Sequence, residues 1–157
     1  MSDEAVLTIT SADEEATRDA GARLGRLLRR GDVVLLSGEL GSGKTCFTQG
    51  IARGLDIEQP VTSPSFVLMN EYDGRETLFH ADLYRMEEVE ELDDLGLWDY
   101  AERGVLVLEW PERGAQLLPG EGVQVELQYG DTERDRVLQV TAIGVRGQEI
   151  ARELGTT

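Results

Sequence analysis

Eight consecutive residues, Gly38-Glu39-Leu40-Gly41-Ser42-Gly43-Lys44-Thr45, match the pattern G-x-x-x-x-G-K-[ST]. In this pattern the glycines let successive backbone N–H groups turn inward and form a concave anion site. The lysine is a compact charge that can lie between phosphate groups, and the final hydroxyl can ligate Mg²⁺. Lys44 is also the single lysine of the chain, whose other cationic residues are arginines and one histidine. The octet predicts a phosphate-binding loop in which Lys44 reaches the β- and γ-phosphates and Thr45 binds magnesium.

The residues on either side of the octet supply the context that this motif requires. Residues 32–37 are mostly apolar and predict a buried strand, and residues 46–53 predict a helix that ends at Gly54. A helix that begins at Lys44 directs the partial positive charge of its N-terminus at bound phosphate. An ordinary glycine-rich turn is the alternative, and the order of strand, loop and helix argues against it.

Two acidic residues stand at the ends of short, mostly apolar segments. Glu109 follows the apolar run 105–108, and Asp82 ends the segment 78–82. A phosphate-binding loop of this type works with a second carboxylate at Mg²⁺ and with a group that orients the attacking water. Both residues are candidates, and the apolar run before Glu109 is typical of a Walker B strand. Because the chain contains 31 acidic residues, a surface acid at a strand end is the alternative for each.

The segment Thr62-Ser63-Pro64-Ser65-Phe66 lies between the predicted P-loop helix and the next strand. In nucleotide-hydrolysing proteins, segments near the γ-phosphate and its metal often act as switches. The hydroxyls of Ser63 and Ser65 are therefore candidates for phosphate or metal binding. A polar turn around Pro64 is equally consistent with these residues.

Two further side chains carry weaker signals. His80 is the single histidine; on a strand such a residue is more often structural, with a proton shuttle as the alternative. Trp110 follows Glu109 directly and is a candidate either for the core or for a stacking or partner surface.

Length and hydrophobic patterning place these candidates on one α/β domain. The 157 residues fit a single domain over residues 1–157, with its core at about 5–144 and a short C-terminal tail. Residues 5–10 predict a strand, and Ser11 to Glu14 predict a capping box that opens a helix. Strand pairs are predicted over 66–72 with 77–82 and over 123–128 with 137–142. The expected fold is a P-loop NTPase-type domain with a central mixed β-sheet flanked by helices.

Composition restricts the compartment and the partners. The formal net charge of −16 disfavours direct binding of nucleic acid over most of the surface. No apolar run of about 18 residues predicts a membrane span, and the N-terminus does not resemble a signal peptide. Cys46 is the single cysteine and cannot form an internal disulfide, which fits a reducing cytoplasm.

Four motifs, taken in order, resemble those of the TsaE (YjeE) family of bacterial ATPases. They are the octet 38–45, Ser63-Pro64-Ser65-Phe66, His80-Ala81-Asp82-Leu83-Tyr84-Arg85 and Glu109-Trp110-Pro111-Glu112. The resemblance runs from about Thr10 to Gly144. Ser65 stands where the family usually has threonine, which keeps the hydroxyl.

The resemblance implies a function and a set of site residues. It implies an Mg²⁺-dependent ATPase that acts with two partner proteins, TsaB and TsaD, which transfer a threonylcarbamoyl group to adenosine 37 of tRNA and so make t6A. The tRNA would be contacted indirectly, and neither DNA nor a membrane is expected as a partner. The implied catalytic residues are Lys44, Asp82 and Glu109, with Thr45 and Glu109 as metal ligands. The implied ATP contacts are Gly38, Glu39, Leu40, Gly41, Ser42, Gly43, Lys44, Thr45, Ser63, Ser65, Trp110 and Arg136, with Arg134 as an alternative to Arg136.

Three other functions share the phosphate-binding loop. A small-molecule kinase needs an acceptor site and usually an arginine-bearing lid, whereas a hairpin is predicted after the P-loop helix. A GTPase is disfavoured because Asp93-Asp94-Leu95-Gly96 lies in an acidic helical stretch and the chain contains no N-K-x-D segment. A regulatory module that binds nucleotide without turnover stays open. We expect an ATPase that is weak alone, because no arginine next to a motif clearly supplies a catalytic finger.

Overall fold

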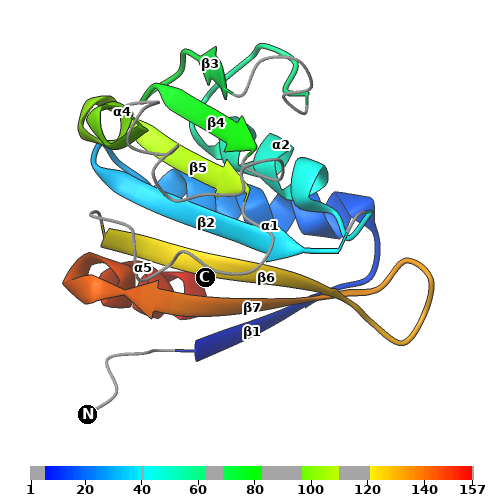
Figure 1. Ribbon diagram of the computed structural model, residues 1–157. Helices are drawn as coiled ribbons and strands as arrows, with labels where there is room; N and C mark the ends of the chain where they lie inside the picture. Colours follow the sequence, from blue (N-terminus) through cyan, green and yellow to red (C-terminus); the bar gives the residue numbers. More distant parts are fainter. Residues whose placement is uncertain (1–5, 40, 63–68, 83–96, 110–120, 157) are drawn as a thin grey trace.

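A seven-stranded mixed sheet forms the centre of the computed structural model (Figure 1). The structure describes residues 6–39, 41–62, 69–82, 97–109 and 121–156. In spatial order the strands are β1 (Val6–Ser11), β7 (Arg136–Ile143), β6 (Glu121–Tyr129), β2 (Asp32–Gly38), β5 (Val105–Glu109), β4 (Leu78–Asp82) and β3 (Met69–Tyr72). β2 is parallel to both of its neighbours, and β4 is parallel to β5, whereas the other pairs are antiparallel.

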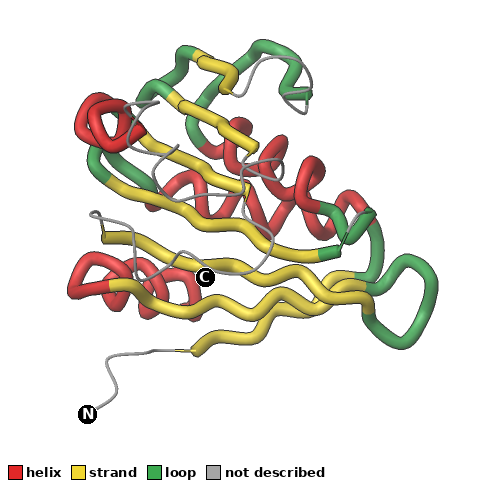
Figure 2. Tube along the Cα trace, in the orientation of Figure 1, coloured by secondary structure: helices red, strands yellow, loops and turns green. Residues whose placement is uncertain are grey.

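Helices cover both faces of the sheet, as Figure 2 shows in red. α1 (Glu14–Leu27), α2 (Lys44–Gly54) and α5 (Gly144–Thr156) pack on one face, and α4 (Leu97–Arg103) lies against β5 on the other. Successive side chains of β2 enter the two cores alternately, as a strand with both faces buried requires. Val34 and Leu36 join the larger core beneath α1 and α2, and Val33 and Leu35 join the smaller one. The predicted fold class is confirmed.

α1 and α2 pack with their backbones in close approach because glycines line the contact. A Cβ atom added at Gly21 would lie 2.3 Å from Phe47 O, and one at Gly50 would lie 2.1 Å from Arg18 O. No side chain fits at these distances. The contact fixes the helix that follows the phosphate-binding loop against the helix that precedes it in the chain.

The start of α1 differs from the predicted capping box. Asp13, not Ser11, caps the helix and accepts a hydrogen bond from Ala16 N at 2.8 Å. Ser11 still belongs to β1, and its hydroxyl instead pairs with that of Thr17 at 2.7 Å. Both residues are common N-caps, so the sequence pattern did not distinguish them.

The C-terminal residues form a helix rather than the expected short tail. In α5, Gly147, Ile150, Ala151 and Leu154 are buried, and Ile150 and Leu154 belong to the larger core. Arg146 anchors the start of the helix by binding Asp32 at the beginning of β2, with Nε and Oδ1 3.0 Å apart. Asp32 raises the pKa of this guanidinium further. Within the described residues, no helix is both long and apolar enough to span a membrane.

Candidate functional site

The octet forms a tight loop between the central strand and α2. β2 ends at Gly38, and α2 begins at Lys44 with Gly43 as its cap. Gly41 and Gly43 have φ angles of 80° and 107°, a region that favours glycine. Because a glycine cap has no side chain, it offers no oxygen to the N–H groups of the first turn, and an anion can take that place. The predicted strand, loop and helix are therefore present, although Leu40 lies outside the described residues.

Two polar groups of the loop show how it would accommodate phosphate. Lys44 Nζ donates to Gly38 O at 2.8 Å, so the ammonium is folded back over its own loop. Ser42 is 1% exposed, and its Oγ has no hydrogen-bond partner among the residues that the structure describes. Buried polar atoms are seldom left unpaired. The loop thus holds a hydroxyl and a cation that suit an anionic ligand.

The two predicted carboxylates lie side by side next to this loop. Asp82 and Glu109 are register partners at the ends of the parallel strands β4 and β5. Glu109 is also the register partner of Leu36 on β2, two residues before the loop. Its position therefore agrees with the predicted Walker B geometry. Glu109 is 6% exposed, so it is not the surface acid that was its alternative.

Glu109 is paired with the single histidine of the chain. His80 Nε2 and Glu109 Oε2 lie 2.5 Å apart, and the imidazole is fully buried. This contact joins β4 to β5 directly behind the strand ends.

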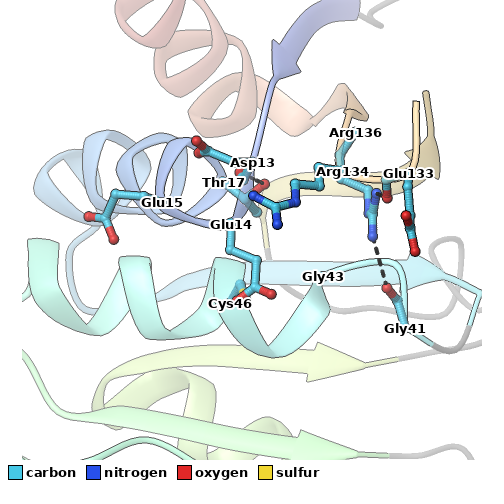
Figure 3. A pocket seen from close by; sticks show the side chains of 10 residues that line it. All are labelled: Asp13, Glu14, Glu15, Thr17, Gly41, Gly43, Cys46, Glu133, Arg134 and Arg136. Carbon is cyan, nitrogen blue, oxygen red and sulfur yellow. Dashed lines mark hydrogen bonds between the residues drawn. The ribbon is translucent and has the colours of Figure 1, made fainter. Parts of the chain in front are cut away.

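The arginine that begins β7 holds the loop from another side. Arg136 donates through Nε to Ser42 O at 3.1 Å. It also donates through Nη2 to Gly41 O at 3.4 Å (Figure 3). Its guanidinium also lies over the ring of Tyr129, 4.6 Å from the centroid. The structure therefore places Arg136 against the backbone of the loop, close to the predicted nucleotide site.

A cavity of about 650 Å³ opens beside the loop. Figure 3 shows the residues around it, which come from the start of α1, from the loop and start of α2, from the β6–β7 connection and from the start of β7. Its lining includes the charged residues Asp13, Glu14, Glu15, Glu133, Arg134 and Arg136. The sequence analysis did not identify the acidic residues that line this cavity, because only the fold brings the start of α1 to the loop.

Cys46 is also part of the cavity lining. Burial raises the pKa of its thiol, an effect that Arg18 opposes and Glu14 reinforces. A raised pKa leaves less thiolate at neutral pH, in agreement with an unreactive helix residue.

The two predicted metal-binding side chains offer oxygen atoms, the kind of ligand that suits Mg²⁺. Within the described part of the chain, no three His, Cys, Asp or Glu residues are grouped for metal binding. Mg²⁺ typically takes one or two carboxylates, with phosphate oxygens and water completing its coordination. The Thr45 hydroxyl and the Glu109 carboxylate, the two predicted ligands, are oxygen groups of this kind. Of the predicted contacts, Leu40, Ser63, Ser65 and Trp110 lie outside the described residues.

A glycine loop at the end of a central parallel strand, with acids ending the next two strands on one side, defines a P-loop α/β protein. Residues 11–138 match the family model "Threonylcarbamoyl adenosine biosynthesis protein TsaE". The chain belongs to the TsaE family.

Individual relatives agree with this assignment. The chain is 40% identical over 147 residues to the tRNA threonylcarbamoyladenosine biosynthesis protein TsaE of Bacillus subtilis, covering 92% of this chain and 90% of the relative. It is 44% identical over 136 residues to the protein of the same name from Nostoc, covering 83% and 82%. The crystal structure of Bacillus subtilis YdiB superposes with a TM-score of 0.81 at 31% identity, covering 99% of this chain and 98% of that one.

Proposed function

We propose that this chain is an Mg²⁺-dependent ATPase that acts together with TsaB and TsaD and supports formation of t6A at adenosine 37 of tRNA. The observation that carries the proposal is the P-loop with Glu109 on the neighbouring strand, in a chain of the TsaE family. The relatives' names connect them with threonylcarbamoyladenosine biosynthesis. Together these support a nucleotide-hydrolysing role in that process. A cytoplasmic location is part of the proposal.

The proposal gives each of the predicted site residues that the structure describes a role in this function. The loop N–H groups and the Lys44 ammonium bind the phosphates, and Lys44 exchanges its bond to Gly38 O for phosphate oxygens. Thr45 and Glu109 hold Mg²⁺, which when bound neutralises charge on the phosphate oxygens. Asp82, beside Glu109, orients the attacking water or a water of the metal. Arg136 keeps the loop in its binding shape through two of its carbonyl groups.

The cavity beside the loop is suited to the uncharged half of the nucleotide. Carboxylates of Asp13, Glu14 and Glu133 in its lining repel phosphate but can accept hydrogen bonds from ribose hydroxyls and the adenine amino group. Arg136 lies toward the loop, where it binds Gly41 O and where the phosphates would begin (Figure 3). ATP would thus lie with its nucleoside in the cavity and its phosphates over the loop.

Steady-state ATPase activity tests the proposal. The pure chain should hydrolyse ATP slowly in the presence of Mg²⁺, and adding TsaB and TsaD should raise the rate. Catalysis of this type commonly needs a further group to stabilise the transition state, and a partner surface can complete the site. Full activity alone, without a response to the partners, would indicate a self-sufficient NTPase. Binding of ATP without turnover under either condition would favour a regulatory module.

A further inference from the structure

A histidine lies in the sheet among buried apolar side chains, where another apolar side chain would be expected. On β4, Leu78 precedes His80 on the same face, and Val107 is the register partner of His80 on β5. Leu78 and Val107 are both fully buried and belong to the larger core. His80 is also 0% exposed. Burying an imidazole here costs free energy unless it is hydrogen-bonded, so the contact that it makes needs an explanation.

The contact is with the carboxylate nearest the P-loop. His80 and Glu109 lie on the same face of the sheet, because Val107 and Glu109 are two residues apart on β5. The Nε2 to Oε2 distance is 2.5 Å, and the side chain of Glu109 is 8% exposed. This hydrogen bond uses one carboxylate oxygen and leaves Oε1 outside it. A glutamate held in this way loses much of its rotamer freedom.

The tautomer of His80 follows from its second nitrogen. Nδ1 has no hydrogen-bond partner within the described residues. If the ring proton is on Nε2, this proton is donated to Glu109, and Nδ1 presents only a lone pair. The opposite tautomer would bury an unpaired N–H and set a lone pair against a carboxylate. The geometry therefore favours a donating Nε2–H.

We propose that His80 is a positioning residue, which orients Glu109 for Mg²⁺ by donating Nε2–H to Oε2. The inference rests on the proposed function, in which Glu109 is a metal ligand. Groups that hydrogen-bond to metal ligands commonly set the ligand's orientation and the affinity of the site. His80 does not touch the nucleotide in this account, and its effect passes entirely through Glu109.

The variants His80→Gln and His80→Asn distinguish the effect of the hydrogen bond to Glu109 from the effect of burying a polar side chain. Glutamine places its amide N–H₂ near the position of Nε2, whereas asparagine is too short to reach Glu109. Phe79→Leu is the matched control, because Phe79 is equally buried on β4 but belongs to the core on the opposite face. Each variant would be titrated with Mg²⁺ at fixed fluorescent ATP analogue, with thermal melting recorded in parallel.

We expect His80→Asn to raise the Mg²⁺ concentration for half-maximal binding by about 10-fold or more. For His80→Gln and Phe79→Leu this Mg²⁺ concentration should stay near the wild-type value. Binding of the ATP analogue without Mg²⁺ should be the same in the wild type and all three variants. Unchanged Mg²⁺ dependence in His80→Asn would overturn the inference, as would an equal loss in His80→Gln and His80→Asn. If the wild-type protein bound the ATP analogue equally well with and without Mg²⁺, the proposed function itself would be contradicted, before any variant is compared.

The wild-type chain allows a second measurement that does not depend on the folding of a variant. Because His80 is the single histidine, its ring nitrogens give unambiguous ¹⁵N signals. The proposal expects the proton on Nε2 and a shift of that signal when Mg²⁺ is added to the ATP-bound protein. A proton on Nδ1, or an Nε2 signal that does not respond to Mg²⁺, would overturn it.

Discussion

Glu109 is a buried carboxylate, and its burial requires a partner that replaces the water around it. A carboxylate whose side chain is 8% exposed loses most of its hydration, which is tolerated when a hydrogen bond or a cation replaces the water. His80 supplies the hydrogen bond in this structure. The sequence pattern singled out Lys44, Thr45 and Glu109 as candidates, and their roles in binding stay predictions. It could not predict the histidine partner, because the two residues are 29 positions apart and meet only when β4 pairs with β5.

At this scale we predict that Glu109→Ala weakens Mg²⁺-dependent ATP binding more than Asp82→Ala does. Glu109 lies on the strand next to the P-loop strand, whereas Asp82 is one strand further away. Mg²⁺ would be titrated against a fluorescent ATP analogue for both variants. Glu109→Gln serves as control, because it can still accept the His80 hydrogen bond but lacks the charge; it should resemble Glu109→Ala. Metal dependence in Glu109→Ala equal to that of the wild type would remove Glu109 from the metal site.

At the scale of elements, periodicity predicted the described strands and the P-loop helix, but not how α1 and α2 meet. The spacing of glycines on the two helices makes the close approach possible, and a residue without a side chain gives no periodic apolar signal. The C-terminal helix was also missed. α5 is rich in glycine and charged residues, which weakens a helix prediction, and its stability comes from packing on β6 and β7.

The helix contact leads to a stability prediction. Gly50→Ala should destabilise the fold by at least about 2 kcal/mol, because its Cβ would overlap Arg18 O, and overpacking exceeds the helix-propensity gain of about 1 kcal/mol. Denaturant unfolding measures the difference. Gly155→Ala is the matched control, since its Cβ would meet nothing closer than a Leu7 methyl at 3.6 Å and should not destabilise α5. Equal stabilities of Gly50→Ala and wild type would mean that the two helices do not pack this closely.

The whole molecule brings together segments that the sequence separates widely. Residues 13–17, 41–46 and 133–136 surround one cavity because β1 and β7 pair at one edge of the sheet and β6 pairs with β2. Sequence patterns identify such strands but do not give their order, so the acidic wall of the cavity could not be predicted. Net charge, in contrast, needs no fold: at −16 the molecule as a whole repels polyanions.

We predict that the isolated chain does not bind tRNA at physiological salt. Affinity for nucleic acid depends strongly on cationic side chains that release counterions, and acidic residues outnumber lysine and arginine by 31 to 15. Electrophoretic mobility shifts with labelled tRNA would test this, with the mixture of TsaB, TsaD and this chain as the comparison. The prediction would be wrong if the chain alone bound tRNA and this binding fell steeply with salt. Such a result would show that part of the surface is basic despite the negative net charge.

The central claim is that the P-loop binds ATP through Lys44. Isothermal titration of ATP with Mg²⁺ into wild type and Lys44→Ala tests it most directly, with thermal melting of both proteins as the check on folding. Among the described residues, the Lys44 ammonium has one hydrogen bond within its own loop, to Gly38 O, so its loss should change the melting temperature by no more than a few degrees. The account predicts saturable binding by the wild type and an affinity at least about 30-fold lower in the folded variant. Equal affinities for ATP in the two proteins would contradict it.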